Sequence, residues 1–321
     1  MRSEGIEVRM PDEADAALPN IKIGFLNMMP DAALAATERQ FLRLVSAYTN
    51  VNCYFYPFEI TGVERSEQTR LHTDEYYLDF NALQNLQIDA LVVTGANVSQ
   101  PLLQNEPFWE ELIKVLSWAR SKVRSSLCSC LATHAAVKVF YDVDRKHMGD
   151  KCWGVFSHDI MLKKHLLLKN VNSPIMMCHS RFNDISQKDF EKHDVDVLIG
   201  SQQAGVQLAC EKDMKVVYFQ GHPEYDDISL LKEYKREIIR FISRQRSDYP
   251  PMPESYFDPS LEAAIEKYRQ QVCSASDYKG LLELFPESEL MRRLDNPWKH
   301  SAQTIFANWI EWLLSEPELS A

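Results

Sequence analysis

The sequence lacks any long hydrophobic run. None of its 321 residues belongs to a stretch near the roughly 18 consecutive apolar residues that a membrane-spanning helix needs. The first twenty residues, "MRSEGIEVRMPDEADAALPN", also lack the apolar block of a signal peptide. We therefore expect a cytoplasmic protein that does not engage a membrane, with residues 1–20 forming a mobile N-terminal arm.

A surplus of positive charge is missing as well. The chain carries 35 Lys and Arg against 46 Asp and Glu, a formal net charge of −11. Binding to the phosphates of a nucleic acid requires a concentrated basic face, so we expect no nucleic-acid partner. Internal repeats and low-complexity tracts are absent too, and a hydrophobic content of 45% is enough for the core of one large domain or two ordinary ones.

The cysteines do not form an even set, and they match no strong zinc pattern. There are seven, most of them in apolar runs such as "VNCYFY" and "IMMCHS", which is typical of reduced core cysteines in a reducing compartment. A metal site could draw on Cys128, Cys130 and His134, with Cys152 or Cys178 as a fourth ligand. Because the spacing C-x-C-x-x-x-H is unlike that of known zinc sites, we expect no metal.

Short apolar, β-rich runs alternate with helical patterns along the first three quarters of the chain. We expect helices over 37–49 and 105–120, and strands over 21–27, 51–58, 88–95, 123–129, 195–201 and 215–221. Near-continuous apolar runs indicate strands covered on both faces, as in a parallel sheet. The alternation predicts an α/β fold with a doubly wound, mostly parallel sheet.

Two stretches interrupt this rhythm. Residues 59–87 are polar, and we expect a surface loop with one short helix there. Residues 249–260, "YPPMPESYFDPS", carry four prolines and are typical of a linker, followed by helices around 260–273 and 301–315. We therefore predict a main domain over 21–248, and over 249–321 a linker and C-terminal helical extension that pack on the same domain.

The stretch "SSLCSCLATHAA", residues 125–136, has the strand-turn-helix layout of a nucleophile elbow. In that layout the nucleophile stands on the turn, at the N-terminus of the helix, where the next backbone N–H can bind an oxyanion. Cys130 fits the turn, whereas Cys128 falls within the strand. A lone cysteine of this kind is more often a buried core residue, so the prediction needs partners.

Partners are available in "YFQGHPEYD", which follows the last predicted strand. In an extended segment residues i and i+2 point to the same side, so His222 and Glu224 can face one way. A carboxylate orients an imidazole and supports its charged form, as a general base for a thiol requires. An exposed ion pair is the competing interpretation. The glycine turn in "VVTGANVSQP" is a weaker candidate for oxyanion N–H groups.

These residues resemble the homoserine O-succinyltransferase and O-acetyltransferase family, which has a flavodoxin-like, class I glutamine amidotransferase-like fold. The similarity extends over nearly the whole chain, through "IGFLNMMP", "TERQFLRL", "LVVTGANV", "WGVFSH", "HSRFND", "GHPEYD" and "FANWIEW" in the family's order. The blocks "GHPEYD" and "HSR" are the most specific. The resemblance implies acyl transfer from succinyl-CoA or acetyl-CoA to L-homoserine, the first committed step of methionine biosynthesis.

Site residues follow from the resemblance position by position. Cys130 would be the acyl-thioester nucleophile, His222 the base and Glu224 its orienting carboxylate. Lys151, Ser180 and Arg236 fall on substrate-binding positions, and the arginine would hold the amino-acid carboxylate. The resemblance also implies a homodimer, with acyl-CoA as co-substrate and no further cofactor.

The chain departs from the family pattern at three places. The family's elbow is C-W-G-A-Q-A, whereas here Cys130 is followed by Leu, Ala, Thr, His134 and Ala. The segment "MPDAALAATERQ" lacks the family's lysines after Met-Pro and has Asp31 instead. The position that separates acyl donors, glutamate in acetyl-using and glycine in succinyl-using members, is Ser99. A small uncharged residue leaves room for a succinyl carboxylate, so we favour succinyl-CoA.

Other functions remain open at this level. Serine could replace homoserine as the acceptor, because both are α-amino acids with a side-chain hydroxyl. The same fold and triad could serve a glutamine-hydrolysing amidotransferase, although the elbow lacks flanking glycines. The altered elbow could also belong to a homologue that binds without turnover.

Overall fold

The computed structural model describes residues 14–275 and 277–315. Its strands are β1 (Asn20–Leu26), β2 (Asn52–Glu59), β3 (Leu78–Asp79), β4 (Ala90–Val93), β5 (Ser125–Ser129), β6 (Lys146–Ile160), β7 (Ile175–Asp184), β8 (Val195–Ser201), β9 (Gly205–Glu211) and β10 (Val216–Phe219). Its α-helices are α1 (Asp31–Val45), α2 (Glu67–Tyr76), α3 (Phe80–Gln84), α4 (Trp109–Lys122), α5 (Leu131–Tyr141), α6 (Gln187–Glu191), α7 (Ser229–Ile242), α8 (Pro259–Ser274), α9 (Glu287–Met291) and α10 (Lys299–Ser315). Short 3-10 helices are η3 (Leu103–Asn105), η4 (Leu166–Leu168) and η5 (Leu281–Leu284).

The strands form one sheet in the order β3-β2-β1-β4-β5-β10-β9-β8-β6-β7. The first six strands in this order, β3, β2, β1, β4, β5 and β10, run parallel to one another. The remaining four, β9, β8, β6 and β7, continue the sheet in antiparallel pairs. The carboxyl ends of β1, β4, β5 and β10 therefore share one edge, where open α/β sheets bind their ligands.

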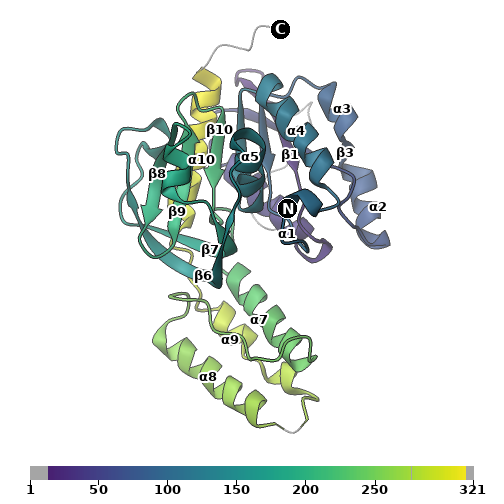
Figure 1. Ribbon diagram of the computed structural model, residues 1–321, viewed down its shortest axis with the longest axis vertical. Helices are drawn as coiled ribbons and strands as arrows, with labels where there is room; N and C mark the ends of the chain where they lie inside the picture. The colour runs from purple at the N-terminus through teal and green to yellow at the C-terminus, as the bar shows by residue number, and fades with distance from the viewer. Residues whose placement is uncertain (1–13, 276, 316–321) are drawn as a thin grey trace.

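Helices cover both faces of the parallel part of the sheet, which explains its near-continuous apolar strands (Figure 1). On one face α1 and α10 pack through Phe41 and Phe306, whose ring centroids are 6.3 Å apart, and Phe306 also stacks on Phe219 of β10. On the other face α4 and α5 bury Leu112 and Ala136 in a second core cluster.

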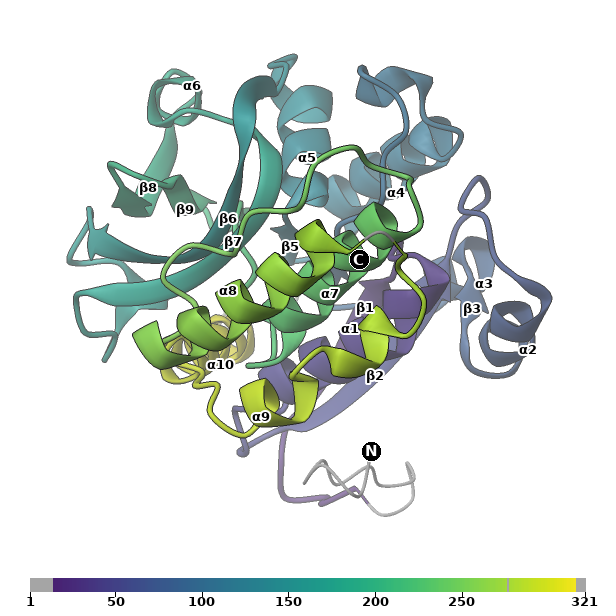
Figure 2. The ribbon, with the colours of Figure 1, turned by 90° about the horizontal axis from the view of Figure 1, so that it is seen from below.

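The helices α7, α8 and α9 form a lobe below the α/β body (Figures 1 and 2). The proline-rich segment before α8 is tied to β6, because Glu254 and the strand exchange backbone hydrogen bonds of 2.9 Å on either side of Gly154. A Cβ at Gly154 would lie 2.3 Å from the Glu254 carbonyl oxygen, so only glycine allows this approach. Asp258 then caps α8 by accepting from the N–H groups of Ser260 and Leu261.

The predicted fold class is confirmed: the chain is an α/β protein with a mostly parallel sheet and C-terminal helices. All six predicted strands are present. The strands β6, β7 and β9 were not predicted, and β6 in particular begins with five exposed residues that hide its strand character. No helix in the described part of the chain is long and apolar enough to cross a bilayer.

Two local predictions were wrong. Residues 59–87 hold two helices and a short strand, α2, α3 and β3, because Ser66 and Asp79 each cap a helix with their side chains. The first helix begins at Asp31, six residues before the predicted start at Thr37, with Pro30 as its N-cap. The expected N-terminal arm lies mostly in residues 1–13, outside the described residues.

Candidate active site

The two halves of the candidate site follow neighbouring strands. In the β5–β10 pair Ser129 lies opposite Phe219, so the residues after each strand emerge side by side at the carboxyl edge of the sheet. The backbone N–H of Cys130 donates to the carbonyl oxygen of Phe219 at 2.7 Å. The turn that carries Cys130 is thereby attached to the strand that leads to His222.

Cys130 stands on a sharp turn between β5 and α5. Its φ is 52° and its ψ −111°, a conformation that residues other than glycine rarely adopt, and it is the N-cap of α5. The hydroxyl of Thr133 lies 2.8 Å from the carbonyl oxygens of both Cys128 and Phe219, which ties the turn to the two strands. A threonine thus supports the elbow where the family pattern has small residues. Cys128 is fully buried, and its thiol pKa is raised by burial.

His134, the unusual residue of the elbow helix, is buried and hydrogen-bonded to another side chain. Its Nε2 lies 3.1 Å from Oε1 of Gln220, which also accepts from the N–H of Ile185 at 2.7 Å. Because Oε1 can only accept, Nε2 of His134 carries the proton. Burial, with the charge of Arg181, lowers the pKa of His134 to about 3, so the ring is neutral. Within the described residues, no group of three His, Cys, Asp or Glu side chains is arranged to hold a metal ion.

His222 and Glu224 are in contact and nearly buried. Nδ1 of His222 lies 2.8 Å from Oε1 of Glu224, and the Ser129 hydroxyl lies 3.4 Å from the other carboxylate oxygen. The two side chains meet across a turn at Pro223 and Glu224, and not along the extended segment that we predicted. The ring of His222 stacks on Tyr225 with centroids 4.2 Å apart, which fixes its plane.

The electrostatics favour the charged imidazole. Burial lowers the pKa of His222, but the Cys130 thiolate and the Glu224 carboxylate outweigh it and hold this pKa well above its usual value. Nε2 of His222 is buried and makes no hydrogen bond to any other group in the described part of the chain, so it is the nitrogen that can exchange a proton with Cys130. The arrangement is that of a nucleophile, its base and the group that orients the base.

A second cluster lies beside the imidazole and centres on Glu233 of α7. Its carboxylate accepts from the Ser180 hydroxyl at 2.6 Å, from the Tyr225 hydroxyl at 2.6 Å and from the Lys151 ammonium at 3.1 Å. Burial raises the pKa of Glu233, but these contacts outweigh it, Lys151 most, and the pKa stays below its usual value. Two of the predicted substrate-binding residues, Lys151 and Ser180, are thus brought together. The sequence did not single out Glu233, which resembles a solvated residue of an amphipathic helix.

Arg236 lies one helical turn after Glu233 and therefore near the same face of α7. Its side chain is 56% exposed, and the carboxylate of Glu237, 3.9 Å away, is only a loose partner. The structure thus places Arg236 on the same helix as Glu233, one turn farther along, with its side chain accessible. It does not place it in direct contact with Cys130 or His222.

The loop after β4 passes close to Cys130. A Cβ added to Gly95 would lie 3.7 Å from Cβ of Cys130 and 3.9 Å from the backbone nitrogen of Leu131. Farther along, the N–H groups of Ser99 and Gln100 both donate to Oε1 of the buried Glu106 at 2.7 Å. Glu106 therefore fixes the loop that carries the predicted donor-selecting residue, Ser99, whose own side chain is exposed.

Positive charge near the Met-Pro segment comes from another part of the chain. Arg65 is buried, donates to the carbonyl oxygens of Asn27 and Met29, and lies 3.7 Å from Asp31. Asp31 in turn accepts from the N–H of Ser66 at 2.8 Å. The acidic residue that departs from the family pattern is therefore neutralised in place, and its pKa is lowered chiefly by the side chain of Ser66, with a smaller part from this backbone N–H.

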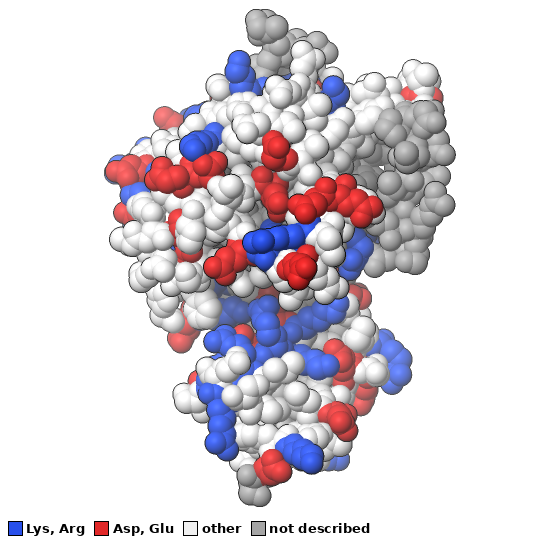
Figure 3. Space-filling view, turned by 90° about the vertical axis from the view of Figure 1, so that its right-hand side faces the viewer, with Lys and Arg blue, Asp and Glu red and all other residues white. Residues whose placement is uncertain are grey.

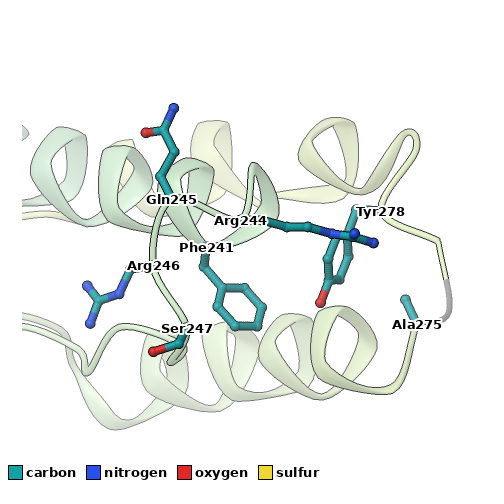
Figure 4. A pocket seen from close by; sticks show the side chains of 7 residues that line it. All are labelled: Phe241, Arg244, Gln245, Arg246, Ser247, Ala275 and Tyr278. Atoms are coloured by element: carbon teal, nitrogen blue, oxygen red, sulfur yellow. The ribbon is translucent and has the colours of Figure 1, made fainter.

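Two further features belong to the helical lobe and to its junction with the α/β body. Lys and Arg side chains gather at the junction between the α/β body and the helical lobe (Figure 3). A cavity of about 380 Å³ at the end of the lobe is lined by Phe241, Arg244, Gln245, Arg246, Ser247, Ala275 and Tyr278 (Figure 4). It includes none of the predicted site residues, and the guanidinium of Arg246 already pairs with Glu237 and Asp248.

Comparison with known proteins points to one family. A family model described as homoserine O-succinyltransferase matches residues 1–318. Proteins named homoserine O-succinyltransferase from Methylobacter tundripaludum and Methylococcus capsulatus are each 47% identical over 313 residues, 97% of this chain and 88% of theirs. The one from Thiobacillus denitrificans is 41% identical over 313 residues, with the same coverage. Among solved structures, a glutamine amidotransferase from Methylobacillus flagellatus is similar in fold, with a TM-score of 0.54 and 12% identity over 95% of this chain and 99% of that one.

Proposed function

Because the chain belongs to the homoserine O-succinyltransferase family, we propose that it transfers the succinyl group of succinyl-CoA to the hydroxyl of L-homoserine through a thioester on Cys130. The observation that carries this proposal is the arrangement of Cys130, on its strained turn, with the His222–Glu224 pair at the end of the adjacent strand. The product, O-succinyl-L-homoserine, would be an intermediate of methionine biosynthesis.

The first half-reaction loads the enzyme. Nε2 of His222 takes the proton of the Cys130 thiol, and the thiolate attacks the thioester carbonyl of the acyl-CoA. The N–H of Leu131, one of the first N–H groups of α5 and without a helical partner, stabilises the oxyanion together with the loop at Gly95. The C–S bond to CoA then breaks, and His222 returns the proton to the departing CoA thiolate.

The second half-reaction unloads it. The amino acid binds beside the Glu233 cluster, where Lys151 and Ser180 lie, with its carboxylate on the accessible guanidinium of Arg236. His222 takes the proton of the hydroxyl, whose oxygen attacks the acyl carbon. The bond to Cys130 breaks, and the thiol regains its proton from His222. One histidine thus acts in both half-reactions, and Glu224 keeps its ring oriented throughout.

The charge distribution suits an acyl-CoA co-substrate. CoA carries a diphosphate and a ribose phosphate, and a protein of net charge −11 needs a local basic surface to bind them. The basic side chains at the junction of body and lobe provide such a surface (Figure 3). We propose no cofactor besides acyl-CoA, and a homodimer stays a prediction.

A CoA-release assay tests the proposal. Purified protein is incubated with succinyl-CoA or acetyl-CoA and with L-homoserine or L-serine, and free thiol is measured over time. We expect release with succinyl-CoA and homoserine, and O-succinylhomoserine as the product by mass spectrometry. Ammonia release from glutamine, or binding of both substrates without turnover, would contradict the proposal in favour of an amidotransferase or a non-catalytic homologue.

A further inference from the structure

Arg145 is a half-buried arginine at the candidate active site, in the segment between α5 and β6. Its Nη2 lies 3.5 Å from the carbonyl oxygen of Gln100, in the same loop whose Gly95 passes close to Cys130. Its Nε is buried and makes no hydrogen bond with any residue that the structure describes. The guanidinium is therefore held beside the loop that carries Ser99, the predicted acyl-donor-selecting residue, and it has an N–H group free to donate a hydrogen bond.

The buried arginines Arg65 and Arg181 differ from Arg145 because each has a carboxylate close to its guanidinium. Arg65 has the carboxylates of Asp31 and Glu59 within 4 Å, and Arg181 has that of Asp184 at 2.9 Å. Among residues 14–275 and 277–315, no carboxylate lies within 4 Å of the Arg145 nitrogens. A partly desolvated cation without a carboxylate in contact is costly, and an anion that binds there offsets that cost.

The surroundings indicate where such an anion would lie. Burial lowers the pKa of Arg145, while the nearby charges of Glu106 and of the Cys130 thiolate raise it, so the guanidinium is close enough to feel both charges. Oε1 of Glu106 is already occupied by the N–H groups of Ser99 and Gln100. An acyl group on Cys130 that extends along this loop, from Gly95 to Gln100, would therefore point toward Arg145.

We propose that Arg145 binds the distal carboxylate of the acyl group and so makes the enzyme prefer a dicarboxylic acyl donor to an uncharged one. This inference rests on the proposed function. A guanidinium offers a carboxylate two parallel N–H donors, whereas an acetyl group or a longer uncharged acyl group has nothing to accept them. Ser99 leaves the space open, and Arg145 supplies the attraction.

The test compares two donors that differ only at the distal group, succinyl-CoA and butyryl-CoA. The rate of acylation of Cys130 is measured by mass spectrometry in single-turnover experiments on the wild type, Arg145→Gln and Arg145→Lys. Lys146→Gln is the matched control, since the neighbouring Lys146 is exposed and paired with Asp189 at 2.9 Å. We expect Arg145→Gln to slow acylation by succinyl-CoA roughly 10- to 100-fold. The rate of acylation by butyryl-CoA should change less than about two-fold.

Arg145→Lys keeps the positive charge without the bidentate geometry, so its acylation by succinyl-CoA should slow less than that of Arg145→Gln. It should also preserve the fold if the glutamine variant is unstable. Equal slowing with both donors, accompanied by slower alkylation of Cys130 by iodoacetamide, would mean that Arg145 only stabilises the thiolate, and would overturn the inference. No slowing with either donor would overturn it too. If the wild type is not acylated by any acyl-CoA, the proposed function itself fails, which separates the two results.

Discussion

The backbone N–H of Cys130 donates a 2.7 Å hydrogen bond to the carbonyl oxygen of Phe219, the last residue of β10. This bond joins the elbow to the strand that precedes His222, three residues further on. The positions of the proposed nucleophile and base therefore follow from the register of two neighbouring strands. Sites built on such rigid elements hold their geometry with little reorganisation during the reaction.

Replacing Cys130 with alanine should abolish the acyl-enzyme. The alanine variant has no thiol at the elbow, and no other cysteine stands on the turn. After incubation with succinyl-CoA, intact-protein mass spectrometry should show an adduct on the wild type and none on Cys130→Ala. Cys128→Ala is the control, because Cys128 is buried in β5 and should matter only for packing. An adduct that persists in Cys130→Ala and vanishes in Cys128→Ala would reverse the assignment.

Glu224→Gln should impair both turnover and the ionisation of His222. The substitution removes a negative charge 2.8 Å from Nδ1, so the pKa of His222 should fall. We expect kcat to drop about 100-fold or more, as it does when a triad histidine loses its carboxylate. NMR titration of the His222 ring measures the pKa, and the CoA-release assay measures kcat. An unchanged pKa would show that Glu224 only packs against the ring.

Arg236→Leu should weaken the use of homoserine. Loss of a bidentate contact with the substrate carboxylate predicts a roughly 10- to 150-fold lower kcat/KM for homoserine, with acylation by succinyl-CoA unaffected. Arg240→Leu, one turn farther along α7 and 49% exposed, is the matched control and should stay near the wild type. Equal effects of the two substitutions would remove the specific role of Arg236.

The catalytic candidates can be predicted from the sequence more readily than the residues that surround them. Cys130 and His222 could be predicted because each follows an apolar strand and precedes a recognisable turn. Glu233 could not be predicted, because its three partners come from β6, β7 and the turn after β10. The strands β6 and β7, which the sequence did not predict, bring these partners together. Arg145 gave no signal either. That no carboxylate of the described residues contacts it is a property of the folded chain that no local pattern carries.

Gly95→Ala should reduce acylation without unfolding the protein. The added methyl would meet its neighbours at 3.7 Å or more, which is ordinary van der Waals contact, so thermal stability should hardly change. It would nevertheless stand beside the backbone nitrogen of Leu131, where the oxyanion is expected to bind. We predict that kcat/KM for succinyl-CoA falls about 10-fold or more. The same loss with a large drop in melting temperature would instead indicate a packing defect.

His134→Gln should make the protein less sensitive to acid. The neutral His134 has a folded-state pKa of about 3, against about 6.5 for an unfolded histidine. Below pH 6.5 this histidine therefore binds a proton in the unfolded chain but stays neutral in the folded protein. The free energy of unfolding consequently decreases as the pH falls. By this linkage His134 alone removes about 2 kcal/mol between pH 7.5 and pH 5.

Glutamine can still donate to Oε1 of Gln220 but cannot be protonated, so that part of the loss should disappear. Urea unfolding at pH 7.5 and pH 5 measures the difference for the wild type and His134→Gln. The exposed His300, changed to glutamine, is the control and should leave the acid sensitivity as it is. Other buried groups, such as His158 and His179, keep their own acid dependence in all three proteins, so only the difference between variants is attributed to His134. If His134→Gln loses as much stability as the wild type, the ring is already charged in the folded protein, and its place beside Gln220 would need another explanation.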